Sequence, residues 1–166
     1  AYQDQVGANN GQGSAYLFSG VAACNSAPGL TAASAPTRQQ GNPSANSQIA
    51  TASDVEDAAN TLQLQISSDG LTFGNSATLN GVTVNLTDGN AGAAGINPNA
   101  GGNVFADIVA ACAATNASFT LRVGDSGNLT TTATISVTVT ANTAPTLGIY
   151  GNTVVGFSGN TTVIPN

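Results

Sequence analysis

Four stretches of the chain alternate strictly between apolar and polar residues, which is the period of a β-strand with one buried face. They are Thr61–Ser68, Gly81–Leu86, Ser118–Val123 and Ala133–Thr140. Most of the polar positions between the apolar ones hold Gln, Thr, Ser or Asn, as in antiparallel sheets that expose one face to water. The predicted core positions are Leu62, Leu64, Ile66, Val82, Val84, Leu86, Phe119, Leu121, Val123, Ala133, Ile135, Val137 and Val139.

Turn and loop residues separate these predicted strands and mark where each one ends. The sequence GDSGN at Gly124–Asn128 predicts a hairpin turn, and Ser47–Ser53 predicts a further strand. Asn90–Gly102 is so rich in Gly and Asn that we expect a long surface loop, whereas Val104–Ala113 fits either a strand or a helical turn. Six or seven short strands between Leu30 and Thr140 predict an all-β fold, an immunoglobulin-like antiparallel β-sandwich with extra terminal β segments.

The charge content is unusually low and excludes several classes of function. Only 6% of the 166 residues are charged, the net charge is −6, and Arg38 and Arg122 are the only basic residues. Nucleic-acid binding needs clustered Lys and Arg, so we exclude it. Without His or Lys the chain has no imidazole base and no amine nucleophile, and Glu56 is its only Glu, so we expect no enzyme. No apolar run approaches the 18 or so residues of a membrane span.

The two cysteines favour an oxidising, extracellular compartment, because they occur in an acidic chain rich in Thr, Asn and Gly. Cys24 precedes the first predicted strand and Cys112 lies just before a later one. We predict a disulfide between them, which would close a long loop and stabilise the fold by about 4 kcal/mol in the chain-entropy model. The alternative is a pair of buried free thiols that pack as small hydrophobic side chains.

One phrase of the sequence occurs twice, since CNSAPGL at Cys24–Leu30 returns as ANTAPTL at Ala141–Leu147. Such an echo is typical of tandem modules that begin with the same linker and first strand. It divides the chain into an N-terminal β segment at residues 1–23, a β-sandwich at 24–141 and a C-terminal β segment at 142–166.

Three parts of the chain resemble known families. IATASDVEDAANTLQLQI followed by FTLRVGDSGNLTTTATISVTVTANTAPTL resembles the Ig-like or cadherin-like modules repeated in large bacterial secreted and surface proteins. DQVGANNGQGSAYLFSG near the N-terminus is similar to the closing segment of FG-GAP-type repeats, without that repeat's Asp-rich calcium loop. The last 21 residues are similar to the first strands of a following Ig-like module. The resemblance implies a structural or adhesive role at the cell surface.

The cadherin-like resemblance also implies calcium, which such modules bind through acidic turns near a junction. The candidate ligands here are Asp54, Glu56 and Asp57 in the sequence SDVED, together with Asp125 in the predicted hairpin. Calcium takes six to eight oxygen ligands, and these carboxylates with backbone carbonyls would supply them. The alternative is that the acidic turns are solvated Asx-turns. We expect no other cofactor.

Four sequons make the chain a candidate for N-glycosylation in a secreted setting. A chain this rich in Asn and Thr produces several by chance. The acceptor residues would be Asn85, Asn116, Asn128 and Asn160.

Two structural functions fit these features. The first is a subunit of a surface filament, a homopolymer in which a terminal β-strand of one copy completes the sheet of the next by donor-strand complementation. The second is an adhesive or spacer module of a large multidomain surface protein, stabilised by calcium. In the first, the apolar residues of the terminal segments would drive assembly: Tyr16, Phe18, Val154, Val155, Phe157 and Val163.

Overall fold

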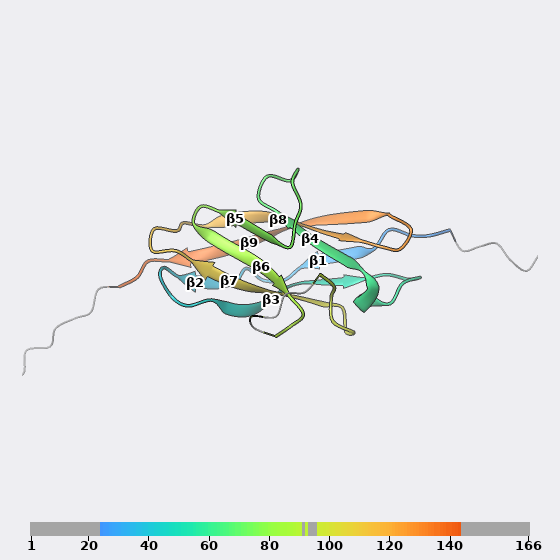
Figure 1. Ribbon diagram of the computed structural model, residues 1–166, viewed down its shortest axis with the longest axis horizontal. Helices are drawn as coiled ribbons and strands as arrows, with labels where there is room; N and C mark the ends of the chain where they lie inside the picture. The colour runs from blue at the N-terminus through green and yellow to red at the C-terminus, as the bar shows by residue number, and fades with distance from the viewer. Residues whose placement is uncertain (1–23, 91, 93–95, 144–166) are drawn as a thin grey trace, which may run out of the picture.

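The computed structural model describes residues 24–90, 92 and 96–143, and these residues form a two-layered β-sandwich (Figure 1). Nine strands lie within them, joined by turns and one 3-10 turn at Ala59–Thr61. The fold class expected from the alternation is therefore confirmed at the level of an all-β sandwich. The terminal segments 1–23 and 144–166, with the predicted assembly residues, lie outside the described residues.

The first sheet has five strands in the order β1-β3-β7-β6-β5, and every neighbouring pair is antiparallel. In β3 the pairing register shifts between Gln48 and Ala50, so that Ile49 and Ala50 are both buried. This is the behaviour of a β-bulge, which adds one residue to one strand. The strands are β1 Gly29–Ala32, β3 Ala45–Ser53, β5 Ser76–Leu79, β6 Val82–Thr87 and β7 Asn103–Ala110.

The second sheet has four strands in the order β2-β9-β8-β4. Its strands are β2 Thr37–Gln39, β4 Gln63–Ser67, β8 Ala117–Gly124 and β9 Thr130–Thr140. β4, β8 and β9 pair antiparallel, but β2 runs parallel to β9. The chain thus passes from the first sheet in β1 to the second sheet in β2 before it returns to the first.

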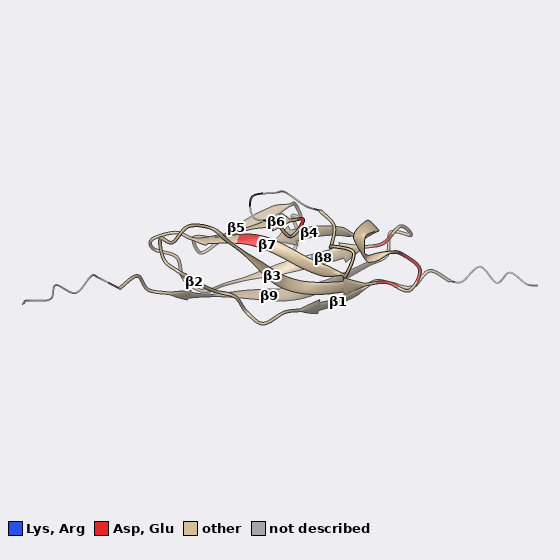
Figure 2. Cartoon of the chain, turned by 90° about the horizontal axis from the view of Figure 1, so that it is seen from below, with Lys and Arg blue, Asp and Glu red and all other residues tan. Residues whose placement is uncertain are grey.

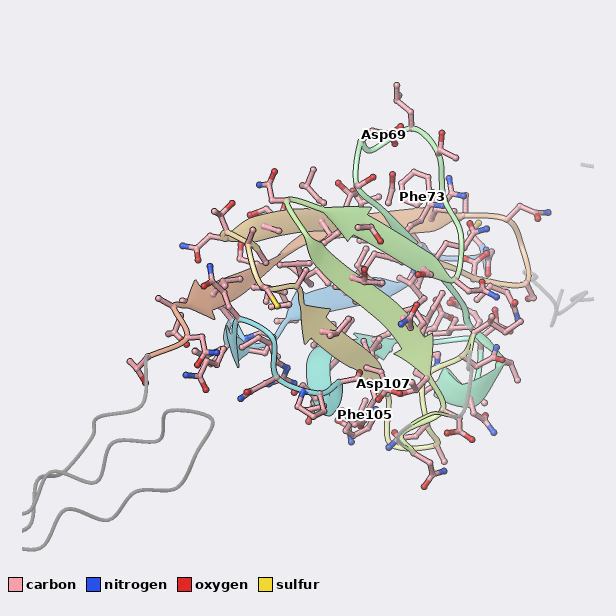
Figure 3. All side chains as sticks on the ribbon, turned by 60° about the vertical axis from the view of Figure 1, so that its left-hand side comes forward. Asp69, Phe73, Phe105 and Asp107 are labelled. Carbon is pink, nitrogen blue, oxygen red and sulfur yellow. The ribbon has the colours of Figure 1, made fainter. Side chains whose placement is uncertain are left out.

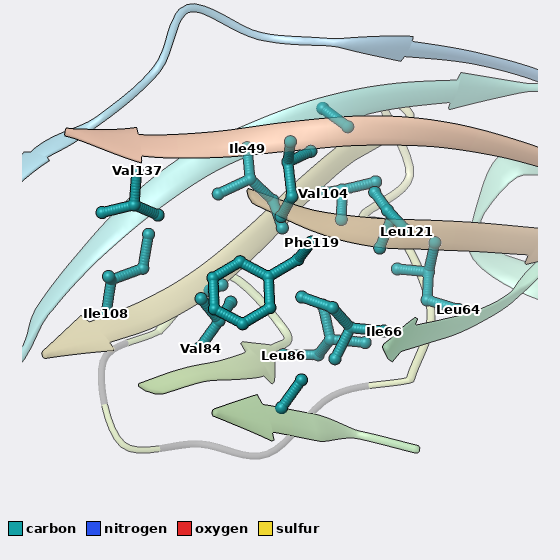
Figure 4. Close-up of a cluster of buried hydrophobic side chains, with 14 of the residues drawn as sticks. Ile49, Leu64, Ile66, Val84, Leu86, Val104, Ile108, Phe119, Leu121 and Val137 are labelled. Carbon is teal, nitrogen blue, oxygen red and sulfur yellow. The ribbon is translucent and has the colours of Figure 1, made fainter. Parts of the chain in front are cut away.

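The core between the sheets contains 11 of the 13 predicted alternating positions, together with apolar residues of β3, β5 and β7 and of the turn before β8 (Figure 4). Phe119 of β8 is 1% exposed, and the neighbouring side chains of Leu121, Val84 and Ile108 are fully enclosed. Of the predicted core positions, Ala133 and Val139 on β9 are only partly buried. Each buried large apolar side chain stabilises the fold by roughly 1.5–3 kcal/mol relative to exposure.

The stretch that fitted either a strand or a helical turn is a strand. β7 buries Val104, Ala106 and Ile108 on its inner face, with the period of a strand. On its outer face Asp107 is nearly buried, and its carboxylate accepts hydrogen bonds from the Asn46 side chain and from the backbone N–H of Gly92. Asp107 and Phe105 lie together on this face (Figure 3).

The predicted surface loop lies between β6 and β7, and part of it covers the edge of β4. The backbone N–H of Leu64 donates to the carbonyl of Ile96 at 2.7 Å, and the Asn97 side chain donates to the carbonyl of Leu62 at 2.7 Å. Further along the same edge, Ile66 and Gly74 exchange two backbone hydrogen bonds. The outer edge of β4 is therefore closed to a further strand.

Candidate functional site

The described chain begins and ends at opposite poles of the sandwich (Figure 1). We call the end at residue 24 the N-terminal pole and the end at residue 143 the C-terminal pole. The Asn25 side chain contacts Asp125 beyond the end of β8, whereas Thr140 and Asn142 contact Gln40 near the turn that precedes β8. The two poles are the candidate functional sites, because any neighbouring module or copy in a linear array would meet them.

Three segments meet at the N-terminal pole and are joined by carboxylates. Asp125 is 8% exposed, and its carboxylate accepts hydrogen bonds from Asn25 Nδ2 at 2.9 Å and from the Leu129 N–H at 2.8 Å. The Asp57 carboxylate accepts from the backbone N–H and the hydroxyl of Ser126, at 2.9 and 3.0 Å. Glu56 accepts longer hydrogen bonds from Ser26. The hairpin is thereby held to the first residues of the described chain and to the acidic loop.

Asp54 shapes the acidic loop itself. Its Oδ1 accepts the backbone N–H groups of Glu56 and Asp57, at 2.8 and 2.9 Å, as in an Asx-turn. These two hydrogen bonds favour the charged form of Asp54 and so hold its pKa below the usual value, and the bond from the Asp57 N–H has the larger effect. Its second oxygen, Oδ2, is buried without a hydrogen-bond partner among the described residues.

The predicted calcium ligands do reach one pole, but they do not converge. Figure 2 shows several acidic positions in red at the N-terminal end of the sandwich, and others on β7 and in a loop farther along. Within the described residues, however, no group of three acidic or thiol side chains is placed to hold a metal ion. The physical reason is that Asp54, Glu56, Asp57 and Asp125 turn their oxygens toward N–H and hydroxyl donors of three different segments. The geometry matches the alternative, hydrogen-bonded turns.

The structure contradicts the predicted disulfide, since Cys24 and Cys112 are both free and exposed. Cys24 precedes Asn25 at the N-terminal pole, whereas Cys112 lies in the turn between β7 and β8 at the C-terminal pole. β8 has 8 residues and runs between these poles, which separates them by roughly 23 Å at the rise of a strand. A disulfide requires Cα atoms within about 7 Å. The alternative of buried thiols is wrong as well, because neither side chain is buried.

At the C-terminal pole, Gln40 connects the end of β9 to the turn that precedes β8. Its backbone N–H donates to the Thr140 carbonyl at 2.9 Å, and its side chain donates to the Ala114 carbonyl at 2.8 Å. The Asn116 side chain accepts the Val139 N–H at 2.7 Å. Sequence reasoning missed Gln40 and Asn25, since only the folded topology brings either residue to its partners.

A third feature is the loop between β4 and β5, which projects from the sandwich (Figure 3). Asp69 organises it by accepting the N–H groups of Leu71 and Thr72, both at 2.8 Å, and the Ser67 hydroxyl at 2.7 Å. These bonds, with Thr72 contributing most, lower the pKa of Asp69 to about 2. At the base of the loop, the Arg122 guanidinium lies 3.9 Å from the centre of the Phe73 ring, a cation–π contact.

Three of the four predicted glycosylation sites are described, and all three asparagines are exposed, but they differ in their place in the fold and in their hydrogen bonds. Asn85 lies on β6 between two other strands, Asn116 lies in the turn before β8, and Asn128 lies in the hairpin between β8 and β9. Asn160 lies outside the described residues.

Comparison with family models, with curated proteins and with solved structures found no match to this chain. Among the described residues, no helix has the length and apolar character needed to cross a membrane.

Proposed function

We propose that this chain is a non-enzymatic, extracellular structural module that transmits force along an array of similar modules. The observation that carries the proposal is that the described part of the chain begins and ends at opposite poles, with β2 and β9 side by side and parallel. The absence of His and Lys from the whole sequence supports a role without acid–base or amine catalysis.

The order of the strands supports the immunoglobulin-like assignment. Immunoglobulin constant-type domains have strands A, B, E and D in one sheet and C, F and G in the other. Here β1-β3-β7-β6 follows the order A-B-E-D, and β9-β8-β4 follows the order G-F-C, with β5 as an additional strand beside β6. An immunoglobulin-like module fits the expectation of a repeated surface domain, which rests on the echo of CNSAPGL in ANTAPTL.

The pairing of β2 with β9 determines how the module would respond to tension. Thr37, Arg38 and Gln39 pair with Thr138, Val139 and Thr140 in the same direction. Tension on residue 24 acts first on β1, which is paired with β3, and through it pulls β2 toward the N-terminal pole, whereas tension on residue 143 pulls β9 toward the C-terminal pole. The strands would have to slide past each other, so their hydrogen bonds would share the force and break together.

Single-molecule force spectroscopy tests this proposal. We expect the whole chain to unfold at a high force when held at residues 24 and 143, because that direction shears β2 against β9. Holding it instead at residues 80 and 143, which both lie at the C-terminal pole, should give a clearly lower force, because strands then peel one bond at a time. Equal forces in the two directions would overturn the proposal.

The second candidate function is the filament subunit assembled by strand complementation. One observation favours it: within the described residues, no backbone group bonds to the outer edge of β5, which would accept a strand from another copy. Electron microscopy distinguishes the two functions, because strand complementation predicts long uniform fibres of the full chain. Monomers or irregular aggregates would contradict the filament.

A further inference from the structure

We propose that Asn128, alone among the three described sequons, accepts an N-linked glycan in the folded protein. A sequon is a useful acceptor only where the transferase reaches both the Asn amide and the hydroxyl two residues later, which usually means a surface loop. The three described sequons meet this requirement very differently. The inference rests on the extracellular location in the proposed function, but its chemistry is testable without it.

The sequon at Asn85 has an exposed Asn side chain, but both its Asn and its Thr are engaged in hydrogen bonds and Thr87 is buried. Asn85 lies on β6, which is paired on one side with β5 and on the other with β7, so its backbone is held in the sheet. Its Oδ1 accepts the Ser76 hydroxyl at 2.6 Å. Thr87, which completes the sequon, is 3% exposed, and its hydroxyl accepts the Asn46 side chain at 2.9 Å.

The sequon at Asn116 is also engaged. The Asn116 Oδ1 accepts the backbone N–H of Val139 at 2.7 Å, so the amide is fixed at the end of β9. The Asn116 carbonyl accepts the Asn80 side chain at 3.0 Å. The hydroxyl of Ser118 lies 3.1 Å from that of Ser136 on the adjacent strand and shares a hydrogen bond with it. Both side chains are exposed, but transfer to Asn116 would require its amide to leave the Val139 N–H and the Ser118 hydroxyl to leave that of Ser136.

The sequon at Asn128 is open. Asn128, Leu129 and Thr130 are all exposed, and Asn128 has a positive φ of 66° at the turn of the hairpin. Within the described residues, neither the Asn128 side chain nor the Thr130 hydroxyl makes a hydrogen bond, so both are available to an enzyme. The hairpin that presents them is held by Asp125 and Asp57, as described above.

Exposed apolar side chains lie around Asn128, and a glycan would cover them. Leu129 is 40% exposed and Val55, on the acidic loop bound to the same hairpin, is 89% exposed. Leu129 belongs to the sequon itself, and Val55 lies on a loop that is hydrogen-bonded to the same hairpin at the N-terminal pole. A bulky hydrated glycan there would shield them from association with other chains.

The transfer needs a lipid-pyrophosphate-linked oligosaccharide as donor and an oligosaccharyltransferase as catalyst. A bond forms between Asn128 Nδ2 and the anomeric carbon of the first sugar. The bond between that carbon and the pyrophosphate oxygen breaks, and the lipid pyrophosphate leaves with the electron pair. The amide nitrogen loses one proton to a base of the transferase.

The test uses the purified full chain carrying N160Q, with a purified oligosaccharyltransferase, its lipid-linked donor and glycopeptide mass spectrometry. We expect one glycan per chain, located at Asn128, and none at Asn85 or Asn116. Asn128→Gln and Thr130→Ala should abolish the product, Thr130→Ser should retain it, and N85Q or N116Q should change nothing. Short synthetic peptides of the three sequons should all accept the glycan, because the differences arise from the fold.

Two results would overturn the inference: no transfer to Asn128 in the folded chain while its peptide is modified, or transfer to Asn85 or Asn116 as efficient as to Asn128. Neither result bears on the force measurement, so failure of this site and failure of the proposed function are distinguishable.

Discussion

Two leucines of this chain are expected to contribute very differently to the stability of the fold, because one is buried on a strand and the other is exposed in a loop. Leu121 on β8 is fully enclosed between the sheets, whereas Leu71 in the projecting loop is 85% exposed. The apolar character of a residue therefore does not by itself identify the core. What identified Leu121 in the sequence was its alternation with polar neighbours, and Leu71 lies in no such pattern.

The first prediction compares these two leucines. Leu121→Ala removes enclosed methyl groups and leaves a cavity, so we expect the free energy of unfolding to fall by about 2–5 kcal/mol. Leu71→Ala, the matched control, should change it by less than about 0.5 kcal/mol. Urea denaturation followed by circular dichroism measures both. A large effect of Leu71→Ala would mean that the loop packs against the sandwich in solution.

The second prediction concerns Asp69 and pH. Its hydrogen bonds lower the pKa in the folded state from 3.8 to about 2. A depressed carboxylate pKa stabilises the fold fully above the unfolded value and loses that contribution as the pH falls through the folded value. Asp69→Asn should therefore lower the urea midpoint at pH 6, and its difference from the unaltered protein should shrink between about pH 4 and pH 2. A difference independent of pH would show that the charge of Asp69 has no part in the effect.

At the scale of elements, short connections fix how the strands meet. Asn80 and Gly81 join β5 to β6 with positive φ angles of 52° and 77°, which a two-residue hairpin with the right-handed twist requires. Gly102 has a φ of 78°, and its carbonyl accepts the Ala52 N–H at 2.8 Å. The loop before β7 is in this way fastened to β3.

The third prediction separates backbone strain from steric overlap at two glycines. Gly102 and Gly70 have nearly equal φ angles of 78° and 73°. A Cβ at residue 102 would overlap the Ala52 carbonyl oxygen, whereas at residue 70 the nearest atom, the Thr120 hydroxyl, is 3.8 Å away. Gly70→Ala should destabilise by roughly 1–2 kcal/mol from the left-handed conformation alone, and Gly102→Ala by clearly more. Equal losses in thermal unfolding would mean that β3 and the loop separate without cost.

Much of the fold, but little of the candidate site, was predictable from the sequence. Long alternating strands such as β8 and β9 are encoded locally, because each residue's face follows from its position. β2, with the sequence TRQ, has no apolar alternation and exists because β9 offers it a partner. The separation of Cys24 from Cys112 likewise depends on which strands run between the poles. Strand pairing of this kind arises only in the folded chain and is not encoded locally.

At the scale of the whole molecule, the described residues complete their own core. Among the described residues, the buried apolar core lies between Ile49 and Val137, Leu30 and Val139 pack against it, and the edge of β4 is closed by the chain's own loop. A sandwich that lacked one of its strands would need a strand from another molecule to fold. Here, in the part of the chain that the structure describes, no strand is missing from the interior of either sheet. This makes the terminal segments candidates for contacts between molecules rather than for the core.

The last prediction follows from that independence and concerns deletion of residues 146–166. The shortened chain should remain a folded monomer, with a urea midpoint close to that of the full chain, because no described core contact is removed. If strand complementation operates, the full chain should form fibres and the shortened chain should form none, as seen by electron microscopy and light scattering. The same fibres from the shortened chain, or no fibres from the full chain, would contradict strand donation by this segment. A large loss of stability on deletion would instead show that the segment folds back onto its own sandwich, because the apolar side chains of a donor strand stabilise only the copy that they enter.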